Sequence, residues 1–153
     1  MTVDEIIAFV QSLGDVHVQR PAPGDGSPQI AWGDVFVYYS PEGDLPRAQP
    51  FVTVVTKDYP DEPPAGLNAA GAFRVNIAAG VDEFRTRLGR DPKGPALENE
   101  PAPGTPATIT AHPTYAFLGW LAVVNPDDGD DVRALITTAH GLARHRFDRR
   151  SAV

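Results

Sequence analysis

One short segment alternates apolar and polar side chains along its length: Phe73-Arg74-Val75-Asn76-Ile77. Successive side chains of a β-strand point to opposite faces of the sheet. A strand at this place therefore puts the three apolar side chains on one face and Arg74 with Asn76 on the other. The apolar set predicts a face that is buried under helices. The polar pair predicts that the opposite face has different surroundings.

Five other segments have the composition of strands. The predicted strands cover 16–20, 34–39, 51–56, 72–78, 107–111 and 115–125. The run 51–56 is rich in β-branched residues, which favour strands, and we predict that it forms a hairpin with 72–78 across a long Pro-rich connection. The segment 115–125 is the longest and is mostly apolar, so we expect it in a central position with Trp120 inside it.

Three segments carry apolar residues at helical spacing, and they cover 3–13, 81–88 and about 130–147. Thr2 and Glu5 form a capping-box pattern at the start of the first helix. Strands that mostly follow strands favour antiparallel pairing. The predicted fold class is therefore α+β: a single, mostly antiparallel sheet of five to six strands, with N- and C-terminal helices and one short internal helix packed on it.

Composition limits the class of protein. The 153 residues are 42% apolar and include no cysteine, which predicts one α+β domain over 1–147 with a C-terminal tail over 148–153 and excludes disulfides and thiolate metal sites. No secretory signal pattern and no apolar run of about 18 residues is present, so we expect a soluble, cytoplasmic protein with no membrane partner. Loops rich in Pro and Gly cover 21–33 and 89–106.

Charge argues against one class of partner. The formal net charge is −7, whereas a groove that neutralises phosphates usually shows a basic surplus. One basic cluster lies within 144–150, and the acidic run 127–131 lies at the other end of the same predicted helix. Both placements complement the helix dipole. Nucleic acid is therefore a disfavoured partner.

Familiar cofactor and catalytic patterns are missing from the sequence. Gly24-Asp25-Gly26 lacks the third glycine of a dinucleotide fingerprint and opens no helix. No serine sits in a nucleophile elbow. His140 and His145 are five residues apart, outside the i, i+4 register that puts two imidazoles on one side of a helix. We therefore expect no cofactor and no metal.

Five residues form a candidate ligand site: Arg74, Asn76, His112, Tyr115 and Trp120. The first two share the polar face of their strand, the next two lie at a strand junction, and Trp120 lies in the last strand. Together they could line a concave patch for a small anionic or planar ligand, since binding sites combine apolar surface with a few convergent polar groups. A strand tryptophan is, however, more often part of a core.

Structural roles are open for the same side chains. Arg74 could pair with Asp58 or Glu62. Asn76 could cap a bulge or bond to the backbone. His112 precedes a proline and could be a turn residue that a neighbouring carbonyl satisfies.

The function that this pattern favours is a small, non-catalytic binding or interaction module with a ligand or partner patch on the sheet face. One alternative is an enzyme that uses His112 as general base and Arg74 as anion stabiliser. A second alternative is a weak nucleic-acid binder that uses the C-terminal arginines. Exposed strand edges could also mediate a homodimer. Because no catalytic set is recognisable, we favour the non-enzymatic function.

Several segments together resemble those of the DUF6194 family, an actinobacterial group of unknown function. They are 4–7, 39–46, 50–56, 73–77 and 112–116, followed by Trp120 and 123–126. The chain departs from this pattern at 21–33, which looks like an insertion. The order of elements is more distantly similar to that of the MmcQ/YjbR-like proteins, which are compact α+β domains with an antiparallel sheet. Neither resemblance implies a substrate.

Overall fold

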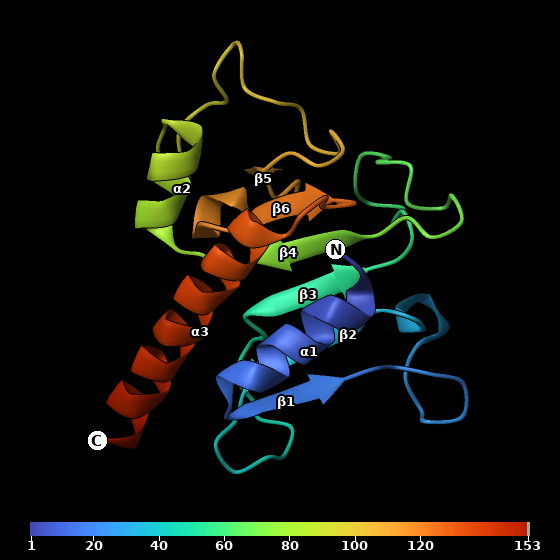
Figure 1. Cartoon of the computed structure of the whole chain (residues 1–153), viewed down its shortest axis with the longest axis vertical. Coiled ribbons are helices and arrows are strands. Elements are labelled where there is room, and N and C mark those ends of the chain that lie inside the picture. The colour runs from blue at the N-terminus through green and yellow to red at the C-terminus, as the bar shows by residue number, and fades with distance from the viewer. Residues whose placement is uncertain (153) are drawn as a thin grey trace.

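The computed structural model describes residues 1–152 and shows one antiparallel sheet with helices (Figure 1). Within these residues the elements are α1 (Val3–Leu13), β1 (Val16–Gln19), the 3₁₀ turn η1 (Gln29–Ala31), β2 (Val35–Tyr39), β3 (Val52–Val55), β4 (Arg74–Ile77), α2 (Val81–Leu88), β5 (Thr110–Ala111), the 3₁₀ turn η2 (Ala116–Leu118), β6 (Leu121–Val124) and α3 (Asp130–Ser151). The predicted α+β class and the predicted order of helices and strands are confirmed.

The six strands follow the order β1-β2-β3-β4-β6-β5, and every neighbouring pair is antiparallel. The predicted hairpin between β3 and β4 is confirmed, with Thr53 opposite Asn76. β6 lies between β4 and β5, and all four of its residues are buried. The inner position of this apolar strand agrees with the expectation from its composition.

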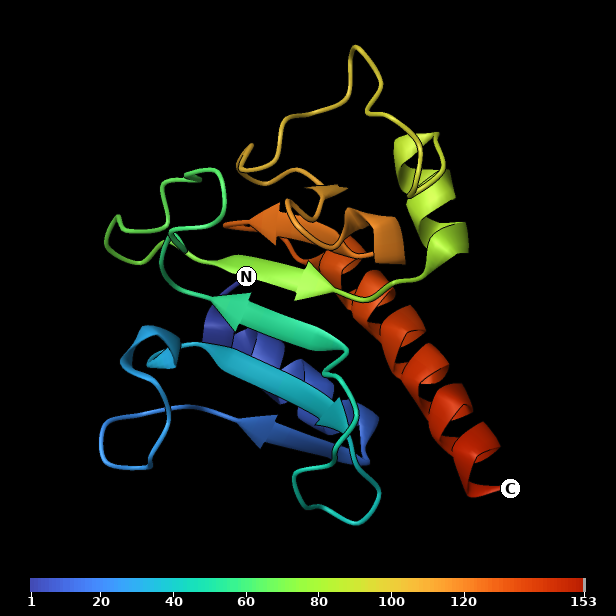
Figure 2. The ribbon, with the colours of Figure 1, turned by 180° about the vertical axis from the view of Figure 1, so that it is seen from behind.

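Two helices cover one face of the sheet. Figure 1 shows α1 and α3 in front of the strands, and Figure 2 shows the reverse face with no helix over its centre in the part of the chain described. Alternation puts the apolar side chains of each strand under the helices. The core contains Ile6 and Val10 of α1, Val54 and Val75 of the sheet, and Leu135 of α3. Burial of each such side chain stabilises the fold by about 1.5–3 kcal/mol.

The last strand is shorter than its sequence suggests. We predicted a strand over 115–125 that contains Trp120, but β6 begins at Leu121, and the residues before it form a turn around η2. Gly119 ends this turn with φ +86°, a left-handed conformation that interrupts an extended chain. Trp120 therefore lies just before the strand rather than inside it.

The last helix is longer than predicted. It continues to Ser151, four residues beyond the end at 147 that its apolar stripe suggested. Arg144 and Asp148 lie one helical turn apart, 3.9 Å between Nε and Oδ2, in the spacing that supports a helix.

In residues 1–152 no helix has the length and apolar character needed to cross a membrane.

Candidate functional site

A cavity of about 590 Å³ lies on the sheet face that the helices leave open. Figure 2 shows this face. The cavity is lined by Phe36, Gln49, Pro50, Thr53, Val55, Tyr59, Asp61, Glu62, Arg74, Asn76, His112, Thr114, Tyr115, Leu118 and Trp120. All five residues of the candidate site are among them, so the fold brings the predicted set together.

The floor of the cavity comes from neighbouring strands in register. Phe36 lies opposite Thr53, and Thr53 lies opposite Asn76. These side chains share the open face because each occupies the same phase of the strand alternation. Arg74 lies two residues from Asn76 on the same face, and the two are only 4% and 1% exposed. A charged side chain buried to this degree needs partners.

Arg74 has those partners. Its Nε donates to Asn76 Oδ1 at 2.8 Å, and its Nη2 donates to Glu62 Oε1 at 3.0 Å. Asn76 Nδ2 donates in turn to Thr53 Oγ1 at 3.0 Å. Of the two possible partners of Arg74, Asp58 and Glu62, the structure shows Glu62. Asn76 bonds to side chains rather than to the backbone.

Glu62 connects two segments that border the cavity. Its Oε2 accepts a hydrogen bond from Thr114 Oγ1 at 2.7 Å, while its Oε1 accepts from Arg74. Burial opposes ionisation of Glu62, but the hydrogen bonds from Thr114 and Arg74 outweigh burial and hold the pKa of Glu62 below its usual value. The loop 57–71 is therefore tied through an ionised carboxylate to the turn that follows His112.

His112 stabilises that turn. Its Nδ1 accepts hydrogen bonds from the backbone N–H groups of Thr114 and Tyr115, both at 3.0 Å. Burial, with the nearby positive charge of Arg74, lowers the pKa of His112 to about 4. The ring is therefore neutral near pH 7 with its proton on Nε2. The structure confirms a turn role for His112, although the partners are N–H donors rather than the carbonyl we had expected.

Aromatic side chains surround the same imidazole. The ring centroid of His112 lies 5.1 Å from that of Tyr115 and 6.0 Å from that of Trp120. Tyr115 is 48% exposed, and its neighbours Phe117 and Leu118 are 50% and 56% exposed. The turn thus presents apolar surface beside the cavity.

Asp34 and Tyr59 form a part of the site that the sequence did not indicate. Asp34 is fully buried, and its carboxylate accepts hydrogen bonds from the backbone N–H of Thr56 at 2.9 Å, from Lys57 Nζ at 2.8 Å and from the Tyr59 hydroxyl. Burial, followed by this bond to Asp34, raises the pKa of Tyr59. Tyr59 therefore lines the cavity as a neutral phenol. Nothing in the local sequence around Asp34 indicates that its carboxylate holds Tyr59, a residue of a distant loop, at the side of the cavity.

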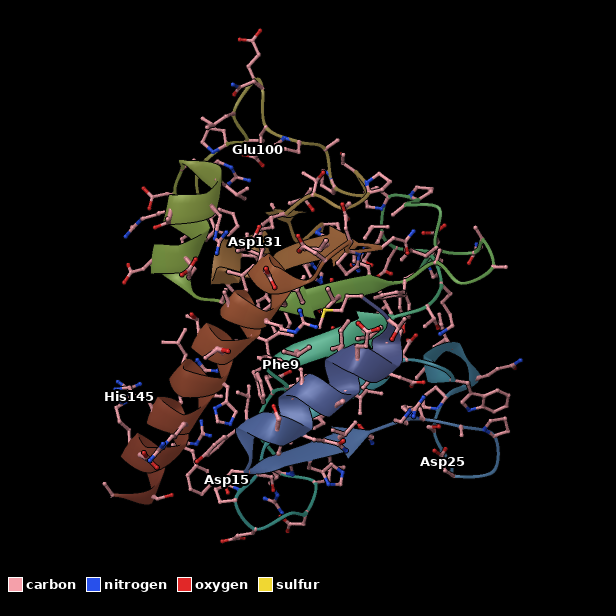
Figure 3. The ribbon with its side chains drawn as sticks, viewed as in Figure 1. Phe9, Asp15, Asp25, Glu100, Asp131 and His145 are labelled. Carbon is pink, nitrogen blue, oxygen red and sulfur yellow. The ribbon has the colours of Figure 1, made fainter. Side chains whose placement is uncertain are left out.

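The two histidines of α3 have different surroundings. Among residues 1–152 no group of three or more His, Asp or Glu side chains is placed to hold an ion. His140 Nε2 lies 2.9 Å from Gly14 O, whereas His145 lies on the outer side of α3, away from the sheet (Figure 3). These two histidines do not converge, as their five-residue spacing predicted.

Fold and site together define an α+β domain with a sheet covered by helices on one side and a cavity lined by aromatic, aliphatic and polar side chains on the other. The chain belongs to the DUF6194 family, a family of unknown function, whose model matches residues 1–152. The resemblance drawn from the sequence segments is confirmed over the whole matched length. No curated protein and no solved structure matches the chain, and nothing found supports the distant similarity to the MmcQ/YjbR-like proteins.

Proposed function

We propose that this protein is a small, non-catalytic binding domain whose sheet-face cavity holds a small molecule. One observation carries the proposal: a cavity of about 590 Å³ contains aromatic walls and a few polar groups that the sheet and two bordering segments hold in place. Ligand sites in proteins have this size and this combination of surfaces.

The way the polar groups are held supports a binding role. Arg74 and Asn76 rise from β4, an inner strand, and each is fixed by hydrogen bonds to other side chains. Glu62 joins the two segments that border the cavity. Sites on strands that are supported by a second layer of hydrogen bonds hold their geometry well.

An enzyme with His112 as general base and Arg74 as anion stabiliser receives less support. A general base needs a free lone pair within reach of the proton that it takes. The only lone pair of neutral His112 is on Nδ1, where two backbone N–H groups already donate to it. The positive charge of Arg74 is already paired with Glu62.

A thermal-shift screen of the purified protein against a metabolite and fragment library tests the proposal. A blocked variant, Thr53→Phe, places a large ring on the cavity floor. Its matched control is Gln19→Phe. Gln19 lies opposite Phe36, which lies opposite Thr53, so Gln19 is on the same open face of the sheet, but it does not line the cavity. We expect compounds that raise the Tm of the wild type and of Gln19→Phe and leave that of Thr53→Phe unchanged. A screen without such compounds contradicts the proposal.

We further propose that the domain works in the cytoplasm. The chain has no cysteine, so it gains no stability from the disulfides that form in oxidising compartments. Cell fractionation with an antibody against the protein tests this location. Recovery in a secreted or membrane fraction contradicts it.

A further inference from the structure

We infer that the ligand is an uncharged, planar molecule that carries hydrogen-bond acceptors on one edge. This inference rests on the proposed function of the cavity and specifies the class of molecule that enters it. The sequence suggested a ligand that is either anionic or planar, and this inference keeps only the planar class. Three features of the lining support it: the shape of its aromatic walls, its unpaired donors and its charge.

Four aromatic side chains of the lining come from three separate parts of the chain. Phe36 belongs to β2, Tyr59 to the loop 57–71, and Tyr115 and Trp120 to the turn before β6. Aromatic faces and edges pack best against flat π systems in offset or edge-to-face arrangements. A planar ring system therefore uses more of this lining than a flexible polar chain does.

Among the buried and half-buried side chains that line the cavity, three nitrogen donors are left without partners, whereas the unpaired polar groups of Gln49, Asp61 and Tyr115 belong to exposed residues. Arg74 Nη1, His112 Nε2 and Trp120 Nε1 make no hydrogen bond to any residue within 1–152, whereas the other nitrogens of Arg74 and His112 do. In the same residues only Trp32 Nε1 is a fully buried side-chain nitrogen or oxygen without a partner. The three donors must therefore reach solvent, and the cavity is the space that all three side chains line. A ligand that satisfies them presents acceptors such as carbonyl oxygens or ring nitrogens.

The charge of the lining argues against an anion. Arg74 is the one cation that lines the cavity, and it is already paired with Glu62 at 3.0 Å. Asp61 adds a second carboxylate, and His112 is neutral because burial lowers its pKa. An entering carboxylate would have to displace Glu62 or lie beside it, at a cost in desolvation and repulsion. A neutral acceptor meets the donors without this cost.

Isothermal titration calorimetry near neutral pH with three matched probes tests the inference. The probes are quinoline-2-carboxamide, which is neutral, quinoline-2-carboxylate, which is anionic, and N-methylquinolinium, which is cationic. For the wild type we expect the amide to bind about tenfold more tightly than either charged probe, a difference that titration resolves easily. The variant Glu62→Gln removes the carboxylate that neutralises Arg74, so it should reverse the preference between amide and carboxylate.

The matched control is Glu98→Gln, which changes the net charge equally at an exposed residue outside the cavity. It should keep the wild-type preference, and circular dichroism establishes that both variants are folded. Tighter binding of the carboxylate or of the quinolinium to the wild type overturns the ligand class but leaves the cavity as a binding site. Absence of binding by all three probes also overturns the class. If the thermal-shift screen finds no ligand either, the proposed function fails with it.

Discussion

Arg74 shows how single residues organise this site. Its guanidinium is almost completely buried, and it bonds to an amide on its own strand and to a carboxylate on a distant loop. Breaking a buried ion pair by removal of one member leaves an uncompensated charge, whereas replacement of both members by apolar residues is often neutral. Arg74 therefore stabilises the fold only together with Glu62.

We predict that Arg74→Met lowers the free energy of unfolding by about 3–5 kcal/mol, because it leaves the Glu62 carboxylate without its cation. The double variant Arg74→Met/Glu62→Met should recover most of this loss. Urea unfolding followed by circular dichroism measures both changes. A double variant no more stable than Arg74→Met alone would show that the pair is not coupled as the structure indicates.

The lowered pKa of His112 predicts a specific pH dependence of the stability of the fold. This pKa is about 4 in the folded chain against 6.5 as the ordinary value, so between these values the unfolded chain binds the proton and the folded chain does not. Stability must therefore fall as the pH falls through this window, by ~3 kcal/mol in total.

The variant His112→Asn separates this titration from all others. An Asn side-chain oxygen can accept the same two backbone N–H groups in an Asx-type turn, but it carries no titrating proton. Urea unfolding at several pH values between 4 and 7 should show that the free energy of unfolding falls less steeply with falling pH for His112→Asn than for the wild type. Equal slopes would mean that His112 is protonated in the folded state or exposed.

The site was predictable at some residues and not at others. Arg74 and Asn76 could be placed on one face because strand alternation is a local property of the sequence. Glu62 could be named only as one of two possible partners of Arg74, and Tyr59 could not be placed at all, because the loop 57–71 takes its path from contacts distant in sequence. Asp58, for example, holds that loop by accepting from the N–H groups of residues 65 and 67.

Among the elements, the turn before β6 departs most from its sequence pattern. Tyr115 and Phe117 have aromatic side chains that favour strands, yet both are exposed, as is Leu118, and the backbone turns through η2. Gly119 explains the difference. A Cβ at this position would lie 2.8 Å from the backbone carbon of Gly80, and φ is +86°. Close packing between two distant backbones is invisible in a single sequence.

We predict opposite effects for two Gly→Ala substitutions. Gly119→Ala should lower the free energy of unfolding by about 2 kcal/mol or more, because it adds a clash and an unfavourable φ. Gly141 lies inside α3 with open space around it, so Gly141→Ala should raise stability by about 1 kcal/mol. Thermal unfolding measures both. A Gly119→Ala protein as stable as the wild type would contradict the observed turn.

At the scale of the whole molecule, the layers decide where a ligand can bind. Strand order could be predicted only in part: the hairpin between β3 and β4 follows from adjacent runs in the sequence, but the insertion of β6 between β4 and β5 does not. The helices carry clear apolar stripes, and both long ones cover the same face of the sheet (Figure 1). The sequence patterns do not say that the other face stays open, because they show which faces are apolar and not how helices are distributed.

The most direct test of the binding role is a titration of the ¹⁵N-labelled protein, followed by two-dimensional NMR, with the compound that raises its Tm most. We predict saturable shift changes at the amides of β3, β4 and the turn 112–120, with little change in α1 and α3. Shift changes concentrated on α1 and α3, or no saturable change with any compound, would contradict the assignment of the sheet-face cavity as the binding site.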